Sequence, residues 1–206
     1  MVDRITPAAT EDTRRTAKEM TGWRHKAAIE TSVFRQRVIV DRFSGGRPYW
    51  EAAAIEPVVR LRIELQETNP KVWCRVDMPL SATLLAVHEI IQVLMGWNDV
   101  HLFEFTAGDR IYGEPYPDDP NGDRKIYKAT SVRLRTLLDR GIHRFLYVYD
   151  FGDYWRLDVT VEEVRDGTSG IDYPAFVDGA RRAPPEDVGG TAGFEGFLEA
   201  VTDPEH

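Results

Sequence analysis

Apolar and charged residues alternate with a period of two between residues 57 and 65. This is the pattern of a β-strand that buries one of its faces. A second short apolar run, 72–76, follows the turn signal Asn69-Pro70. Two such runs on either side of a turn predict a β-hairpin at the start of the region.

A different period begins at about residue 82 and predicts a helix over 82–95. Ser81 or Thr83 can cap its start, and Gly96 stands at its end,. The apolar positions recur every three or four residues, as on the buried face of a helix. These positions are Leu84, Val87, His88, Ile91, Leu94 and Met95. His88 therefore lies on an apolar stripe, which is more typical of a core histidine than of a ligand.

The rest of the chain contains further short elements. Two strong strands flank Asp150-Phe151-Gly152-Asp153, which has the composition of a hairpin turn,. A last helix follows a proline- and glycine-rich passage. In chain order we expect strands at 101–105 and 110–112, a short helix at 132–139, strands at 145–149 and 155–161, and a helix at 194–201.

The predicted strands occur as hairpins, and no regular strand–helix–strand crossover repeats along the chain. This order predicts an α+β fold, with a mostly antiparallel sheet built of hairpins and helices packed on one face. We place this domain at residues 57–206. Residues 1–56 are predicted to form a helical or partly ordered N-terminal extension, because residues 8–38 are rich in Ala, Glu, Arg and Lys and poor in apolar residues.

Charge is distributed unevenly. The 206 residues carry a net charge of −8, yet residues 1–56 hold ten Lys/Arg and eight Asp/Glu, a net charge of +2. The remaining residues hold sixteen Lys/Arg and twenty-six Asp/Glu, a net charge of −10. An acidic main domain argues against broad contact with a phosphate backbone, so nucleic-acid binding is left only to the basic N-terminal arm.

Composition also limits the compartment. No apolar run reaches the roughly 18 residues of a membrane span, and the N-terminus lacks the apolar stretch of a secretory signal,. The single cysteine, Cys74, cannot form an internal disulfide. We therefore expect a cytoplasmic protein without a membrane partner.

Familiar catalytic motifs are missing. Asp150-Phe151-Gly152 matches the metal-binding triplet of protein kinases, but the glycine-rich loop, the strand lysine and the catalytic loop of that family are absent from the sequence,. No phosphate-binding loop or dinucleotide fingerprint occurs,. His88-Glu89 lacks the second histidine of a zinc helix,. The triplet is better explained as a hairpin turn.

A looser set of polar residues remains near predicted strand ends and loops. Histidines and carboxylates of this kind bind a divalent metal or transfer protons when the fold brings them together. The alternative is a set of turn-capping aspartates and solvated surface charges. The set comprises His88, His101, Glu104, Asp150, Asp153, Asp178, Glu186 and Asp187.

Several stretches resemble, in the same order, a known family, the plasmid pRiA4b ORF-3-like proteins, which are also described as insertion-element passenger proteins of the TnpR type. The resemblance covers about residues 57–204. The stretches are Leu84-Leu85-Ala86-Val87-His88-Glu89-Ile90-Ile91-Gln92, Met95-Gly96-Trp97, His101-Leu102, Tyr112-Gly113, Tyr149-Asp150-Phe151-Gly152-Asp153-Tyr154-Trp155, Tyr173-Pro174, Asp178-Gly179-Ala180-Arg181, Pro184-Pro185-Glu186-Asp187-Val188-Gly189-Gly190 and Phe197-Leu198.

The resemblance implies a compact α+β domain without an established biochemical role. Nothing in the sequence resembles the active site of a serine recombinase, so the TnpR description does not imply recombination. Many relatives carry cysteines near the Pro-Pro-Glu-Asp stretch and a second histidine after His101. This chain has Phe176, Ala183, Val188 and Phe103 at those positions, so a metal site built on those cysteines is not expected here.

Three functions stay open. The preferred one is a non-enzymatic binding or interaction module, associated with mobile or accessory bacterial genes, that takes a protein or small-molecule ligand. The alternative is a metal-dependent or acid–base enzyme using His88, His101, Asp150 and Asp153, with no cofactor identified. The third is nucleic-acid binding through the N-terminal arm. The candidate site comprises His88, His101, Asp150, Asp153, Trp155, Asp178, Arg181, Glu186 and Asp187.

Overall fold

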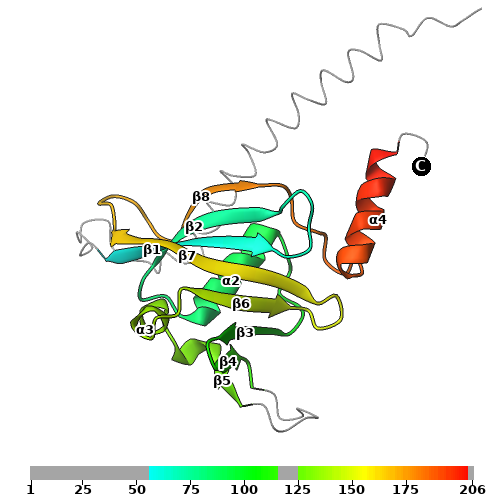
Figure 1. Cartoon of the computed structure of the whole chain (residues 1–206). Helices are drawn as coiled ribbons and strands as arrows, with labels where there is room; N and C mark the ends of the chain where they lie inside the picture. Colours follow the sequence, from blue (N-terminus) through cyan, green and yellow to red (C-terminus); the bar gives the residue numbers. More distant parts are fainter. Residues whose placement is uncertain (1–55, 116–124, 204–206) are drawn as a thin grey trace, which may run out of the picture.

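The computed structural model describes residues 56–115 and 125–203. Within these ranges the chain forms one mixed sheet and three α-helices (Figure 1). The strands are β1 (Pro57–Leu65), β2 (Trp73–Pro79), β3 (Phe103–Ala107), β4 (Arg110–Gly113), β5 (Ile126–Lys128), β6 (Arg144–Tyr149), β7 (Trp155–Asp166) and β8 (Ala175–Ala180). The helices are α2 (Leu84–Met95), α3 (Leu134–Asp139) and α4 (Gly190–Thr202), with a 3₁₀ turn η1 (Ala129–Ser131).

Hairpins build most of the sheet, as the alternating pattern predicts. The eight strands lie in the order β5-β4-β3-β6-β7-β1-β2-β8. Every neighbouring pair is antiparallel except β4 and β5, which run parallel. The mostly antiparallel α+β architecture is therefore confirmed.

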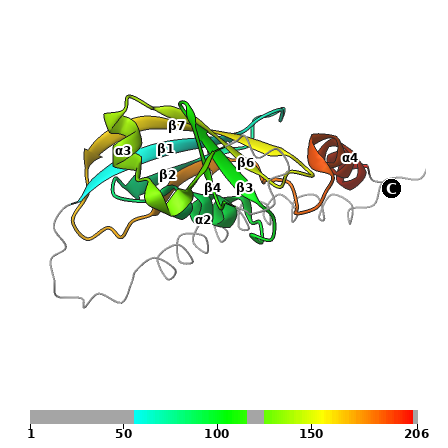
Figure 2. The same cartoon turned by 90° about the horizontal axis from the view of Figure 1, so that it is seen from below.

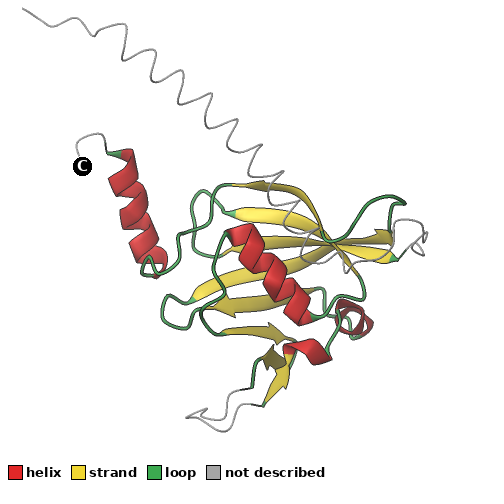
Figure 3. Cartoon of the chain, turned by 180° about the vertical axis from the view of Figure 1, so that it is seen from behind, coloured by secondary structure: helices red, strands yellow, loops and turns green. Residues whose placement is uncertain are grey.

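Helix α2 crosses one face of the sheet and covers the core (Figure 3). Thr83 Oγ1 accepts a hydrogen bond from the Ala86 amide and caps the helix, and Gly96 ends it in the left-handed conformation at φ 75°. Its apolar stripe packs on buried side chains of the central strands, such as Leu61 and Tyr147. The predicted helix is thus confirmed, with its start at Leu84 rather than residue 82 and its end at Met95 as expected.

The other face of the central strands carries charged side chains in ion pairs. Arg60 Nε donates to Asp77 Oδ1 over 2.8 Å, and Arg165 reaches the same carboxylate. Arg62 and Arg75 both lie over the ring of Trp73. This arrangement explains the alternation in β1 and β2: one face is a dry core and the other a neutralised polar surface.

Helix α4 departs from the expectation that all helices pack on one face. It extends beyond the β6–β7 turn rather than over the sheet (Figures 1 and 2). Only Gly190 and Phe194 are buried on it, so α4 gains little from packing on the domain. Within the described ranges, no helix is long and apolar enough to cross a membrane.

Two strands are not expected from the sequence pattern. Strand β5 has only three residues, and β8 lies in the proline- and glycine-rich passage. The strand expected at 101–105 is found at Phe103–Ala107. The predicted N-terminal helix at 8–38 falls outside the described residues.

Candidate functional site

The loop between β8 and α4 folds back onto the β6–β7 turn and the end of α2. The Trp97 indole donates to the Pro184 carbonyl over 3.1 Å, and the Gly189 amide donates to Asp153 Oδ2 over 3.1 Å. A Cβ on Gly190 would lie 2.8 Å from the Asp153 carbonyl oxygen, so only glycine permits this close approach. These contacts bring residues 183–190 beside the strand ends.

His101 lies at the centre of a group of carboxylates. Its Nε2 atom is 2.9 Å from Asp187 Oδ1, 3.6 Å from Asp150 Oδ2 and 3.9 Å from Glu186 Oε1. One ligand atom from each of His101, Asp150 and Asp187 lies within 4.8 Å of the others. Three separate parts of the chain therefore converge on one point, which we call the His101 cluster.

Asp150 is the buried member of the His101 cluster, with 7% of its surface exposed. It follows β6 in a left-handed conformation at φ 54°, which Asp adopts more readily than most residues. Its Oδ1 atom accepts a hydrogen bond from the Gly152 amide over 2.9 Å. The other oxygen, Oδ2, is the one that faces His101. The turn thus fixes this carboxylate and aims one of its oxygens into the cluster.

Glu186 is held by hydrogen bonds at both of its oxygens. Tyr149 donates its hydroxyl to Oε1 over 2.7 Å, and the Asn98 amide donates to Oε2 over 2.7 Å. The Tyr149 hydroxyl accepts in turn from the Val100 amide. Burial, and then the hydrogen bond to Glu186, raise the pKa of Tyr149 well above its ordinary value. Tyr149 therefore stays a neutral donor that orients Glu186.

The surrounding charges affect the protonation of His101. Partial burial lowers the pKa of its imidazole, but the hydrogen bond to Asp187 and the charges of Asp150, Asp187 and Glu186 raise it more. The net result is a pKa above the ordinary histidine value,. Three nearby carboxylates thus favour a positive charge at this point, which either a proton or a metal cation can supply.

The geometry of the His101 cluster suits a metal ion. Donor atoms bound to a metal at roughly 2.0–2.3 Å lie about 3–4 Å from one another. His101 Nε2 is 2.9 Å from Asp187 Oδ1 and 3.6 Å from Asp150 Oδ2, and the three donors lie within 4.8 Å of one another. One imidazole nitrogen with carboxylate oxygens is a donor set for first-row ions such as Mn²⁺ or Zn²⁺. Ca²⁺ and Mg²⁺ prefer oxygen donors alone.

His88 lies in a separate hydrogen-bond network inside the domain. It is 1% exposed; its Nδ1 atom is 2.8 Å from the Tyr147 hydroxyl and its Nε2 atom is 2.8 Å from Asp99 Oδ1. The Asp99 amide donates to Gln92 Oε1, so Gln92 Nε2 donates to the Tyr147 hydroxyl. The Tyr147 hydroxyl thus joins Gln92 to His88, and Asp99 closes the network on the other side of the ring.

The remaining predicted site residues are dispersed. Asp153 holds the Gly189 amide, Trp155 is buried in the core, and Asp178 pairs with Arg75 on the opposite face. Arg181 is exposed, with a left-handed backbone at φ 74°. Of the nine candidates, the structure brings together His101, Asp150, Glu186 and Asp187.

Sequence reasoning misses the residues that position the cluster. The pattern identifies Tyr149 only as a strand residue and Trp97 only as part of a turn, yet they bind Glu186 and Pro184. Their rings stack with centroids 4.9 Å apart. The alternation of apolar residues in β6 could have placed Tyr149 on the core face. No pattern along the chain relates Tyr149 to Glu186, which lies in a loop 37 residues later.

Residues 57–206 match the model of the plasmid pRiA4b ORF-3-like proteins, and the chain belongs to this family. It is 37% identical over 152 residues to the uncharacterized protein y4hQ of Sinorhizobium fredii, covering 74% of this chain and 77% of that protein. A solved structure, MM3350 of unknown function from Methanosarcina mazei, superposes with a TM-score of 0.67 at 32% identity, covering 74% of this chain and 85% of that one. The TnpR description gains no support from these relatives.

A second similarity is to sugar-alcohol and related oxidoreductases. The uncharacterized oxidoreductase YdfI of Escherichia coli is 52% identical over 58 residues, which is 28% of this chain but 12% of that protein. D-arabinitol 4-dehydrogenase of Ralstonia nicotianae is 28% identical over 181 residues, 34% of its length. The chain spans only a small part of these enzymes, so their activities do not transfer to it.

Proposed function

We propose that this protein is a binding module whose working site is a divalent-cation site in the His101 cluster. The donors are His101 Nε2, Asp150 Oδ2 and Asp187 Oδ1, with Glu186 beside them. The carrying observation is the convergence of three donor atoms, within 4.8 Å of one another, from three parts of the chain. The binding-module interpretation and its association with mobile or accessory genes come from the sequence and remain predictions.

Electrostatics support a cation at this point. Three carboxylates surround one imidazole, so the site holds more negative than positive charge even when His101 is protonated. A divalent ion replaces the imidazole proton and offsets two of the three carboxylate charges, and its binding releases that proton. The carboxylate oxygen that does not face the ion also has a role: Asp150 Oδ1 accepts a hydrogen bond from the Gly152 amide, which orients Asp150 Oδ2 as a donor to the ion,.

The same geometry favours binding over catalysis. The enzyme alternative requires His88 and Asp153 as well as His101 and Asp150. Both ring nitrogens of His88 have hydrogen-bond partners, and Asp153 Oδ2 holds the Gly189 amide. These two residues are therefore structural, and the ion joins the 183–190 loop to the β6–β7 turn.

Calorimetric titration of the EDTA-treated full chain tests the proposal. ZnCl₂ or MnCl₂ should bind with a stoichiometry of one, and more tightly than CaCl₂. Asp187→Asn should weaken binding at least about tenfold, since it removes a charged donor. Asn tolerates the left-handed backbone that Asp187 adopts at φ 54°,, so the change should preserve the loop.

Asp178→Asn is the matched control, because it removes an exposed carboxylate that pairs with Arg75 on the other face. It should leave the affinity unchanged. If neither ion binds the wild-type chain, or if Asp187→Asn binds as well as wild type, the proposal is wrong.

A further inference from the structure

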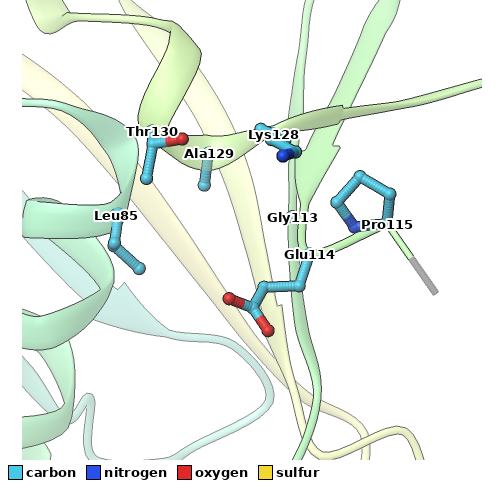
Figure 4. Close-up of a pocket in the computed structure, with 7 residues that line it drawn as sticks. All are labelled: Leu85, Gly113, Glu114, Pro115, Lys128, Ala129 and Thr130. Carbon is cyan, nitrogen blue, oxygen red and sulfur yellow. The ribbon is translucent and has the colours of Figure 1, made fainter.

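Two adjoining hollows lie between α2 and strands β3 to β5. Their volumes are about 340 and 310 Å³, at the lower end of the roughly 300–1,000 Å³ typical of small-molecule sites. Leu85 and Glu114 line both. The first hollow, shown in Figure 4, contains none of the donors of the His101 cluster, whereas the second includes His101 in its lining.

The floor of the first hollow is formed by backbone and small side chains. A Cβ on Gly113 would lie 2.7 Å from the Phe103 carbonyl oxygen, which leaves no room for another residue. Gly113 pairs with Lys128 in the parallel β4–β5 ladder. Both strands end here, so Lys128 and the next residue after β4, Glu114, border the hollow at the carboxyl ends of the two strands.

Glu114 and Lys128 bring opposite charges to one hollow without neutralising each other. Figure 4 shows them on opposite sides of the space, with Leu85 and Thr130 beside it. Most other charged side chains near the sheet are in ion pairs, such as Arg140 with Asp109 and Arg144 with Asp158. In the described ranges no ion pair of Glu114 or Lys128 is found, and both residues are exposed. The hollow therefore offers one negatively and one positively charged side chain to a ligand.

We propose that the first hollow binds the head group of a free α-amino acid. Glu114 accepts hydrogen bonds from the ligand ammonium, and Lys128 binds the ligand carboxylate together with the Thr130 hydroxyl. The ligand side chain lies over Leu85 toward the second hollow, whose wall includes Leu102 and the partly buried Phe103. His88, Asp99 and His101 also line the second hollow, but Leu85, Leu102 and Phe103 offer contacts to an apolar side chain such as that of leucine.

The test is a titration of the full chain with leucine, followed by ¹⁵N-¹H NMR. Shift changes should saturate and cluster at residues 113–114 and 128–130. N-acetyl-leucine lacks the ammonium and leucinamide lacks the carboxylate, so each should bind at least about tenfold more weakly. Repeating the titration with Asp187→Asn separates the two proposals, because this variant should bind leucine as wild type does.

Charge variants assign the two contacts. Glu114→Gln should weaken the binding of leucine about tenfold and the binding of leucinamide by a similar factor. Lys128→Met should abolish the preference for leucine over leucinamide. Lys125→Met is the matched control, since Lys125 lies over the Tyr127 ring and does not line the hollow. Absence of saturable leucine binding, or equal binding of all three compounds, overturns the proposal.

Discussion

Individual side chains in this domain carry out two separate electrostatic tasks. His101 is partly exposed among carboxylates that favour its charged form. His88 is buried, and both of its ring nitrogens have hydrogen-bond partners inside the domain. The sequence makes both histidines candidates for the site. Their difference arises from neighbours such as Tyr147 and Asp187, which only the fold supplies.

The stability of the domain should depend on the protonation of His101. Its folded pKa is raised, so the ion pairs contribute fully below the unfolded value of about 6.5 and are lost as pH rises through the folded value. In EDTA, His101→Gln should therefore reduce the free energy of unfolding most near pH 5.5 and least above pH 8. Urea unfolding across this range measures the effect. His143→Gln, which removes an exposed histidine outside the cluster, should show no such trend.

Metal affinity should have the opposite dependence on pH. A proton on His101 competes with the ion, so Zn²⁺ binding should weaken as pH falls through the raised pKa,. Calorimetry between pH 6 and 8 in two buffers of different ionisation enthalpy would show the weakening and the released proton together. Affinity that is constant over this range would exclude His101 as a donor.

The buried network around His88 should be costly to interrupt. Tyr147→Phe removes the hydroxyl that links Gln92 to His88 and leaves both groups without that partner. We expect a loss of about 1–3 kcal/mol in the free energy of unfolding, measured by urea denaturation. Tyr154→Phe is the control, because Tyr154 is 54% exposed; an equal loss in both variants would contradict the role of the network.

At the scale of elements, the connection between the last loop and the β6–β7 turn decides whether the site exists. Gly190 has φ 67° and no room for a Cβ against Asp153. Gly190→Ala should separate the loop from the turn and weaken Zn²⁺ binding, with a stability cost of about 1–3 kcal/mol. Gly196→Ala lies in the same helix with open space around it and should be neutral or stabilising. Calorimetry and hydrogen exchange of α4 distinguish the two variants.

Some elements can be predicted from the local sequence pattern, and others cannot. Periodicity, capping residues and turn composition predict α2, the β1–β2 hairpin and the β6–β7 hairpin, because each depends on neighbours in sequence. Strand β8 has no such signal, because its short sequence shows little alternation. It forms by pairing with the edge of β2, and the pairing has a register shift between Arg75 and Val76. The convergence of Asp187 on His101 has no local signal either, since 86 residues separate them.

At the scale of the whole molecule, the core, the sheet and both proposed sites, in the part of the chain that the structure describes, lie within residues 57–203. The family model covers residues 57–206. We therefore expect a fragment of residues 57–206 to fold alone, with the same urea midpoint as the full chain and the same Zn²⁺ affinity. A fragment that is aggregated or less stable would show that the first 56 residues contribute to the domain. A gel-shift comparison of the full chain with the fragment would test whether the first 56 residues bind nucleic acid.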